Sequence, residues 1–448
     1  MKNVLVLGAG LVARPLLRYL LAHYEHRVLV ATLDVPRAQI LMGEHPRGSI
    51  IHHDVSDIQK TTPLLAESDV VVSLLPAELN VPIAKLAISL RKPMINTSYA
   101  SPEMWALDEE ARRGGVLILN EIGLDPGIDH MSAVAKVKEI KFGGGKVTSF
   151  LSCCGGFPAQ DANTNPWGYK FSWNPRGVLK AGLQPARYLR SNEAVEIDGG
   201  GIVFDYCWPL EFPELGVFEI YPNRDSLKYV SLYHLEGVNG MFRGTLRYPG
   251  WCATMRAIRD LGLFDAEEVE WPEGTTYRDV ATRKLQGNGG HLSARLARFL
   301  DISPDSEEMA RLEWVGLFSD RPIESRKSSP LDIFLNRMQA LMMYRPGERD
   351  LVALQHVFHV AYPDGSREEI RSSLVKTGEP WGDTAMSRTV SLPAAIATRL
   401  ILDEGVMAEG VQVPVLREIY EPVLKELETY GIRMEETRVK TFRSPLDT

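Results

Sequence analysis

Residues 2–13 read KNVLVLGAGLVA, and this stretch decides the fold of the first part of the chain. The apolar run Lys2–Leu7 is followed at once by Gly8-x-Gly10-x-x-Ala13 and then by a helical pattern of leucines. Gly8 permits a tight turn, Gly10 lets the backbone approach a pyrophosphate at a helix N-terminus, and the small Ala13 lets helix and strand pack closely. A glycine turn with a purely structural role is the alternative. The position of the motif between a strand and a helix favours a Rossmann dinucleotide site.

Further apolar runs alternate with helical stretches after this motif. They lie at Arg27–Ala31, Ser49–His53, Asp69–Leu74, Pro93–Asn96 and Val116–Leu119. These runs are nearly continuously apolar, as expected for parallel strands that helices cover on both faces. The sequence therefore predicts an α/β fold, with a Rossmann-type, doubly wound parallel sheet over residues 1–125.

After residue 125 this alternation ends and a different pattern begins. Strand-like runs lie at Lys146–Cys154, Val217–Tyr221, Met241–Tyr248 and Ala353–Tyr362, and mostly helical stretches at Trp251–Ile302 and Pro330–Met343. We expect a second, α+β domain over residues 126–389, with a helical portion at about 251–343, that binds substrate and forms a homodimer. The tail contains two further helical stretches, Pro393–Leu402 and Val415–Tyr430.

Composition narrows the class of protein. A chain of 448 residues exceeds what one hydrophobic core serves, which agrees with two domains. The formal net charge of −8 gives no reason to expect nucleic acid as a partner, and an acidic substrate needs a local basic cluster. No run approaches the ~20 apolar residues of a membrane span, and the start does not read as a signal peptide. The four cysteines form no Cys-x-x-Cys pair, so we expect a reducing, cytoplasmic location and no metal.

Several longer words of sequence resemble one family, in order and register over most of the chain. They are Asn120–His130 (NEIGLDPGIDH), Ser98-Tyr99, Cys154-Gly155-Gly156, Tyr169–Trp173 (YKFSW), Pro222–Ser226 (PNRDS) and Arg243–Tyr248 (RGTLRY). The family is saccharopine dehydrogenase of the glutamate-forming type. The resemblance implies oxidation of saccharopine, the secondary amine that joins lysine and glutamate skeletons, to L-glutamate and 2-aminoadipate 6-semialdehyde in lysine metabolism. It also implies that residues 390–448 pack back on the first domain.

The choice of cofactor depends on the end of the second predicted strand. Asp34 lies just past it, where a carboxylate accepts hydrogen bonds from the adenine ribose and repels a 2′-phosphate; a solvated loop acid is the alternative. Arg37 follows one helical turn later, within reach of a phosphate. The NADP-using fungal members of the family carry Arg where this chain has Leu33, so in that respect the chain resembles the NAD-using branch. We therefore expect NAD, with NADP as the alternative. Further expected cofactor contacts are Ala9, Leu11, Val12, Asp54, Val55, Leu75 and Trp173.

Saccharopine carries three carboxylates, so the resemblance implies fixed arginines, because a planar guanidinium meets a carboxylate with two hydrogen bonds. Arg224 and Arg247 are the candidates, and ordinary surface arginines are the alternative. Other expected substrate contacts are Ser98, Tyr99, Asp125, Thr245 and the backbone of Leu246.

The chemistry requires a general base, because the substrate amine must lose its proton before it releases hydride. Asp125 is the candidate, since it lies beyond the last predicted strand of the sheet; a turn residue before Pro126 and Gly127 is the alternative. Tyr99 and Cys154 are candidates for proton relay, against the commoner fates of a core aromatic and a buried thiol. His356 and His359 lie in an alternating run and are predicted to be strand residues rather than metal ligands.

Two other functions remain open at this stage. One is a related dehydrogenase of a carboxyalkyl amine of the carboxynorspermidine type, whose single carboxylate fits a pair of arginines poorly. The other is a catalytically silent Rossmann protein that senses the cofactor ratio or serves as an assembly subunit.

Overall fold

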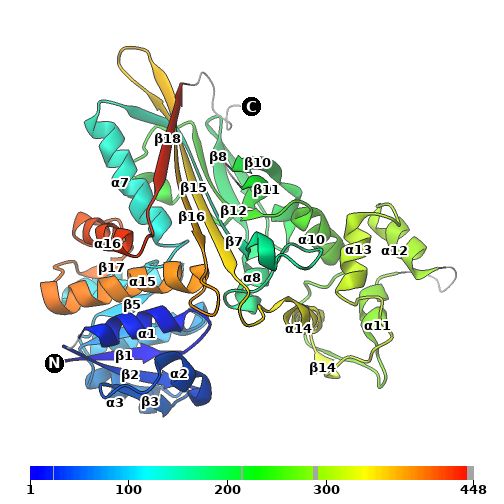
Figure 1. The fold of residues 1–448 in the computed structure, drawn as a ribbon, viewed down its shortest axis with the longest axis horizontal. Coiled ribbons are helices and arrows are strands. Elements are labelled where there is room, and N and C mark those ends of the chain that lie inside the picture. The colour runs from blue at the N-terminus through cyan, green and yellow to red at the C-terminus, as the bar shows by residue number, and fades with distance from the viewer. Residues whose placement is uncertain (24, 213–214, 286–290, 441–448) are drawn as a thin grey trace. The chain divides into compact units, whose positions relative to one another are not determined.

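The computed structural model describes residues 1–23, 25–212, 215–285 and 291–440. Contacts within the chain group these residues into two units (Figure 1). The first unit is Met1–Val147 with Ser231–Glu236 and Val360–Lys440, and the second is Thr148–Val230 with Gly237–His359. The domain boundary after residue 125 stays a prediction from the sequence.

The first unit contains a parallel sheet whose strand order, over the described residues, is β17-β6-β5-β4-β1-β2-β3. The strands are β1 (Lys2–Leu7), β2 (His26–Thr32), β3 (Gly48–His52), β4 (Val70–Ser73), β5 (Met94–Asn96), β6 (Leu117–Leu119) and β17 (Gly410–Gln412). Strand β1 pairs in parallel with β2 on one side and with β4 on the other. All predicted strands of the doubly wound sheet form, so the predicted fold class is confirmed. Strand β17, which pairs with β6, was not predicted.

Helices of the first unit connect and cover these strands. They are α1 (Ala13–Ala22), α2 (Val35–Met42), α3 (Ile58–Ala66), α4 (Asn80–Ser89), α5 (Pro102–Trp105), α6 (Asp108–Gly114), α7 (Ile128–Phe142), α15 (Ala385–Arg399) and α16 (Arg417–Thr429), with short turns η1 (Ala77–Leu79) and η4 (Leu400–Glu404). Strands β16 (Arg367–Thr377) and β18 (Glu435–Lys440) pair antiparallel. The apolar core lies between the sheet and its helices and contains Leu5, Val71 and Ile118.

Helix α15 lies beside α1 in the first unit (Figure 1), and Ser391 of α15 donates a hydrogen bond to the carbonyl of Val12. It begins at Ala385, earlier than the predicted Pro393, because the side chain of Thr384 caps it by accepting from the amide of Ser387. Pro393 lies inside the helix.

The second unit is built on a mixed sheet and a set of helices. Its strands are β7 (Lys146–Pro158, which begins in the first unit), β8 (Ala186–Arg190), β9 (Glu193–Ile197), β10 (Trp208–Phe212), β11 (Gly216–Pro222), β12 (Gly240–Arg247) and β15 (Asp350–Ala361), with a separate pair, β13 (Val269–Glu270) and β14 (Lys327–Ser328). Strands β10, β11 and β12 run antiparallel, and β12 pairs in parallel with β7. His356 and His359 lie within β15, as predicted.

The helices of the second unit are α8 (Pro175–Gly182), α9 (Tyr229–Leu232), α10 (Trp251–Asp260), α11 (Tyr277–Thr282), α12 (Leu292–Leu300), α13 (Glu307–Trp314) and α14 (Pro330–Met342), with short turns η2 (Gln160–Ala162) and η3 (Ile202–Asp205). Within the predicted helical stretch Trp251–Ile302, the described residues form α10, α11 and α12, with β13 between α10 and α11, and residues 286–290 lie outside the described residues. In the part of the chain that the structure describes, no helix has the length and apolar character to cross a bilayer.

The turn before α7 requires glycine at residue 127. Gly127 has φ +147°, and a Cβ there would lie 2.1 Å from the carbonyl oxygen of Gly123. At the other end of α7, Gly144 has φ +79°, but a Cβ there meets nothing within 4 Å.

Gly127→Ala should lower the free energy of unfolding by about 3 kcal/mol or more, because the backbone of the turn must move to make room for the Cβ. Gly144→Ala should lower it by only about 1–2 kcal/mol. Equal losses in denaturant titrations would contradict this account.

Candidate functional site

The carboxyl ends of β1 and β4 form the centre of a candidate dinucleotide site. Gly8 follows β1 with φ +93°, and a Cβ on it would lie 3.3 Å from the carbonyl oxygen of Leu74 and 3.4 Å from Leu75. A Cβ on Gly10 would meet nothing within 4 Å, so open space adjoins the backbone there. Ala13 is fully buried where α1 begins. Gly8 thus serves the turn, and Gly10 leaves room for a ligand.

The N-terminus of α1 carries no side-chain cap. Its N-cap residue is Val12, and its first turn holds no acidic residue. Ala9 is buried, while Leu11 and Val12 are half-buried beside this end of the helix. The first amides of the helix can therefore donate to a pyrophosphate, which the positive end of the helix dipole also favours.

The carboxylate of Asp34 has a structural role that its sequence position did not predict. It is the N-cap of α2, and its Oδ1 accepts a hydrogen bond from the amide of Arg37 at 3.0 Å. Its own amide donates to Thr32 Oγ1 at 3.2 Å. Arg37 is half-buried, and its Nε has no partner among the residues that the structure describes. The carboxylate of Asp34 thus caps the helix, whereas the Nε–H group of Arg37 can still donate a hydrogen bond to a ligand.

Two other expected cofactor contacts follow β3. Asp54 Oδ1 accepts from both the amide and the hydroxyl of Ser56, at 2.9 and 2.7 Å, and these hydrogen bonds hold the pKa of Asp54 below its usual value. Val55 is 8% exposed and packs into the core of the first unit. Leu75 follows β4 and packs against the same core. All three lie at the edge of the sheet where the strands end.

The loops after β5 and β6 bring together two of the predicted catalytic residues. The hydroxyl of Tyr99 donates to Asp125 Oδ1 at 2.5 Å. Asn96 at the end of β5 anchors the first loop, since its Oδ1 accepts from the amide of Ser98 at 3.0 Å and its Nδ2 donates to Asn120 at 2.6 Å. The phenol and the carboxylate are therefore held against each other by neighbouring strand ends.

Sequence analysis missed the buried group that supports this pair. Glu121, which has φ +60° and is 1% exposed, accepts from the amide of Ala100 at 2.9 Å through Oε1. Its Oε2 lies 2.8 Å from Nε2 of His130, whose Nδ1 bonds the hydroxyl of Tyr233. The word NEIGLDPGIDH contains both Glu121 and His130, but nothing in it distinguishes a supporting acid from a reacting one.

In the second unit, Arg247 is a buried cation that has no ion-pair partner among the described residues. It is 6% exposed, and its guanidinium lies 5.1 Å from the ring centre of Tyr169 and 5.2 Å from that of Trp251. Its Nη1 donates to the carbonyl of Leu246 at 2.8 Å. Its Nε has no partner, and no carboxylate among the described residues forms an ion pair with it. Burying a charge in this way is costly unless a ligand completes it.

The aromatic rings around Arg247 do not neutralise it. Burial raises the pKa of Tyr169 to about 12, and Arg247 opposes only part of this rise. Glu219 faces Arg247 across the β11–β12 pair, but its two oxygens accept from the amides of Gly250 and Cys252, at 2.6 and 2.9 Å. An anionic ligand therefore fits the unmet hydrogen-bonding capacity at Arg247.

The register of three strands places other predicted residues beside this arginine. Thr245 pairs with Cys154 of β7 on one side and with Tyr221 of β11 on the other. Because alternate residues of a strand share a face, Thr245 and Arg247 point to the same side of the sheet. Leu246 is fully buried, and its carbonyl accepts a hydrogen bond from Arg247. Tyr221 was missed because its nearness follows from strand register, and Tyr169 and Trp251 were missed because theirs follows from the packing of a loop and of α10.

Two predicted residues lie elsewhere in the second unit. Arg224 follows β11 with a left-handed backbone, φ 59°, and its carbonyl accepts from the amide of Arg187 at 3.0 Å. Trp173 is half-buried over α8, where a Cβ on Gly177 would lie 2.7 Å from its ring. The structure thus describes the two groups of predicted site residues in separate units.

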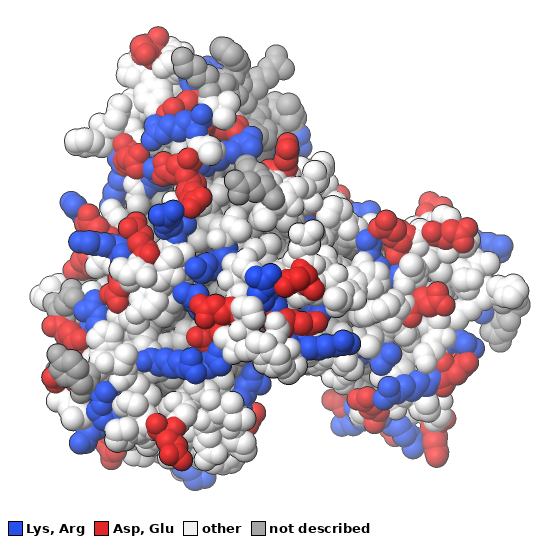
Figure 2. Space-filling model, viewed as in Figure 1, with Lys and Arg blue, Asp and Glu red and all other residues white. Residues whose placement is uncertain are grey.

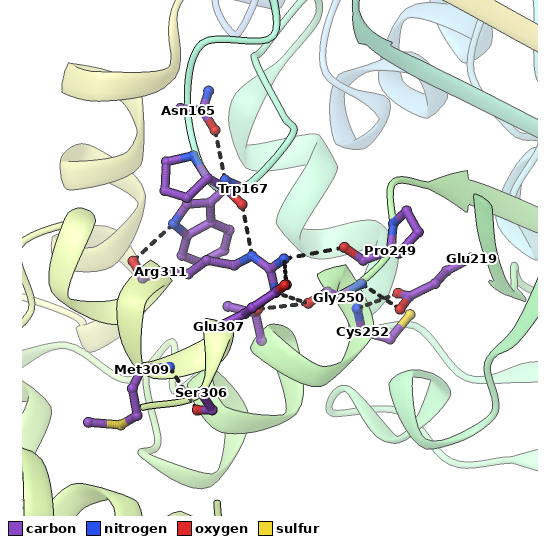
Figure 3. Close-up of polar contacts among 12 residues, drawn as sticks. Asn165, Trp167, Glu219, Pro249, Gly250, Cys252, Ser306, Glu307, Met309 and Arg311 are labelled. Carbon is purple, nitrogen blue, oxygen red and sulfur yellow. Dashed lines mark hydrogen bonds and ion pairs between the residues drawn. The ribbon is translucent and has the colours of Figure 1, made fainter. Parts of the chain in front are cut away.

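A second buried arginine holds the turn that follows β12 (Figure 3). Arg311 Nη1 donates to the carbonyl of Gly250 at 3.1 Å, and Nη2 to that of Pro249 at 3.3 Å and to Glu307 at 2.7 Å. Its Nε donates to the carbonyl of Pro166 at 2.8 Å. Unlike Arg247, this guanidinium is fully occupied by protein groups, so its role is to fix the turn.

The distribution of charge on the surface says less about where an anion binds than these buried groups do. Figure 2 shows Lys and Arg side chains interspersed with Asp and Glu over the face in view. With a net charge of −8, recognition of an anion depends on individual cations such as Arg247.

A parallel sheet with this glycine turn and open helix end defines a protein with a Rossmann dinucleotide-binding domain. Two family profiles match the chain in tandem: "Saccharopine dehydrogenase NADP binding domain" over residues 4–119 and "Saccharopine dehydrogenase C-terminal domain" over residues 123–432. The chain belongs to the saccharopine dehydrogenase family.

Similar proteins span the whole chain. Saccharopine dehydrogenase [NADP(+), L-glutamate-forming] of Saccharomyces cerevisiae is 37% identical over 98% of this chain and 99% of its own, and that of Schizosaccharomyces pombe is 35% identical over 97% and 99%. The mitochondrial alpha-aminoadipic semialdehyde synthase of Bos taurus is 34% identical over 96% of this chain and 47% of its own. The apo structure of saccharopine dehydrogenase (L-Glu forming) from Saccharomyces cerevisiae superposes with a TM-score of 0.85, over 98% of this chain and all of its own.

These findings correct the choice of cofactor. The prediction of NAD as the main cofactor is wrong, because the matching domain is an NADP-binding one and the fungal relatives are named for NADP(+). The physical reason lies at Asp34. An acid at this position repels a 2′-phosphate when its carboxylate faces the ligand, but here the carboxylate caps α2.

Proposed function

We propose that the chain interconverts saccharopine and water with L-glutamate and 2-aminoadipate 6-semialdehyde, with NADP as the dinucleotide. The observation that carries the proposal is Arg247, a buried guanidinium without an acidic partner among the described residues. An anionic substrate supplies that partner. The fungal relatives named for this reaction align with nearly the whole chain.

The residues of the first unit fit a phosphorylated dinucleotide. Gly10 and the uncapped end of α1 receive the pyrophosphate, and Arg37 donates from its unoccupied Nε to the 2′-phosphate, while Asp34 holds the backbone of the same turn. Bound NADP supplies the hydride acceptor. Arg37 thereby takes the part that an arginine at position 33 plays in other members of the family.

The substrate's carboxylates are assigned to arginines of the second unit. Arg247 meets one carboxylate with its fork, and Thr245 on the same face of β12 donates its hydroxyl. Arg224 is assigned to another carboxylate, and Ser98 and the backbone of Leu246 remain proposed contacts. The pair of Arg247 and Arg224 also favours saccharopine over an amine with a single carboxylate.

Proton transfer is assigned to Asp125. Tyr99 donates to its Oδ1, and we assign to this carboxylate the acceptance of the proton of the substrate's secondary amine. Cys154, beside Thr245, is the proposed relay for the later proton transfers that accompany hydrolysis of the imine.

The role of Arg37 in cofactor choice is testable with one neutral variant. Arg37→Gln should raise the KM for NADP roughly ten- to a hundredfold, because a hydrogen bond to a charged group contributes about 1.5–3 kcal/mol. The KM for NAD should stay unchanged. Arg27→Gln, at the amino end of β2, is the matched control. A wild-type protein that uses NAD more efficiently than NADP, or an Arg37→Gln variant with an unchanged KM for NADP, would show that the assignment is wrong.

Arg247→Lys tests the carboxylate fork. Lysine keeps the charge but loses the planar pair of donors, so the KM for saccharopine should rise about tenfold or more. The KM for NADP should hardly change. Arg190→Lys at the exposed end of β8 is the control. If both KM values rise together in Arg247→Lys, the arginine serves folding of the unit rather than substrate binding.

Asp125→Asn tests the base. It should lower kcat about 10²–10⁴-fold, the usual contribution of a general base, while NADP binding read by fluorescence stays intact. Tyr99→Phe should lower kcat by a smaller factor, because the carboxylate of Asp125 stays in place. An Asp125→Asn variant that keeps more than about a third of the kcat would reduce Asp125 to a turn residue.

A further inference from the structure

Three side chains of the second unit gather where β10, β11 and α10 meet. They are Cys207 just before β10, Glu219 in β11 and Cys252 in the first turn of α10, and their sulfur and oxygen atoms all lie within 4.8 Å of one another. Cys252 is fully buried, while Cys207 is half-exposed. Because the two cysteines are far apart in sequence, no Cys-x-x-Cys pattern predicts that their side chains lie close together. The proposed reaction uses neither thiol.

The surroundings favour thiol chemistry over a metal ion. Arg256 Nη1 lies 4.0 Å from the sulfur of Cys207, and a second cation beside it would be repelled. Both oxygens of Glu219 already accept from the amides of Gly250 and Cys252. The thiol of Cys252 donates to Cys207, which together with Arg256 lowers the pKa of Cys207 to about 7 despite its partial burial. The same hydrogen bond, together with burial, raises the pKa of Cys252.

This arrangement separates the roles of the two sulfurs. Cys207 has a lowered pKa, is partly exposed and lies next to a guanidinium, which is the environment of a reactive thiolate. Cys252 stays protonated and within reach, which is the position of a resolving thiol. Cys153 and Cys154, in contrast, lie buried in β7.

We propose that Cys207 and Cys252 form a peroxide-responsive thiol pair that closes into a disulfide. The thiolate of Cys207 attacks one oxygen of hydrogen peroxide, the O–O bond breaks, and hydroxide leaves and is protonated to water. The sulfur of Cys252 then attacks the sulfenic acid of Cys207, the S–O bond breaks, and the thiol proton leaves with the oxygen as a second water. Two thiols are oxidised, and one peroxide is reduced to two waters.

The disulfide acts on the turn that carries Arg247, and this consequence rests on the proposed function. The two sulfurs lie within 4.8 Å of each other, and closing them to an S–S bond of about 2 Å draws the start of α10 and the residue before β10 together. That movement strains the hydrogen bonds that the amides of Gly250 and Cys252 donate to Glu219, which Figure 3 shows beside Pro249 and the Arg311 contacts. Trp251 stands between these amides and supports the guanidinium of Arg247. Oxidation therefore weakens binding of the anionic substrate.

The experiment treats the whole wild-type protein with a slight excess of hydrogen peroxide and maps thiols and disulfides by mass spectrometry without reduction. We expect a peptide pair joined through Cys207 and Cys252, with Cys153 and Cys154 still as thiols. The KM for saccharopine should rise about fivefold or more, the lower end of coupling between two sites, with the KM for NADP unchanged. Dithiothreitol should reverse both changes. In Cys252→Ser, Cys207 should pass to sulfenic and sulfinic acid with no disulfide.

The two readouts separate the thiol pair from the proposed function. Free thiols at Cys207 and Cys252 after peroxide, or a disulfide between two molecules, would overturn the proposal whatever the activity. A disulfide between Cys207 and Cys252 without a change in the KM for saccharopine would overturn the link to Arg247. Absence of any turnover in the untreated protein would count against the proposed function, while the mapped disulfide would still decide the chemistry of the pair.

Discussion

The parallel hydrogen bonding of β1 with its two neighbours is the constraint on which the first unit depends. Leu7, the last residue of β1, pairs with Ala31 of β2 and with Ser73 of β4, so these strands end at one edge of the sheet. The chain must turn sharply after each of them, which explains Gly8 with its positive φ. Since β5 and β6 run in the same direction, their following loops bring Tyr99 and Asp125 to this edge as well. One register thus positions both the dinucleotide site and the proposed base.

In the second unit, the hydrogen-bond partners of two buried arginines distinguish a structural role from a role in binding a ligand. Arg247 and Arg311 are both buried. Arg311 donates hydrogen bonds to backbone carbonyls, to Thr254 and to Glu307, and it thereby fixes the turn after β12. In the part of the chain that the structure describes, Arg247 contacts one carbonyl and two aromatic faces, and its Nε has no partner. A folded protein tolerates such a group when a ligand completes it, which is why Arg247 carries the proposed function.

Sequence alone predicted the features that depend on local pattern. The apolar runs and the turn at Gly8 placed the strands of the parallel sheet, because helix and strand periodicities are local. Strand β17 was missed, since its short run Gly410–Gln412 becomes a strand only by pairing with distant β6. The partners of Arg311 and the neighbours of Arg247 were missed for the same reason. NAD was chosen wrongly because a sequence shows that Asp34 is acidic but not that its carboxylate caps α2.

The central claim is that a chain of this family uses its buried arginine and its NADP-binding edge to cleave saccharopine between the secondary amine and the carbon of the lysine skeleton, so that the nitrogen leaves with L-glutamate. The most direct measurement is the amount of each amino acid released per NADPH formed, with wild-type protein, pure saccharopine and NADP. The account predicts one L-glutamate for each NADPH, with no lysine. Release of lysine in place of glutamate, or NADPH formation that does not depend on saccharopine, would contradict it.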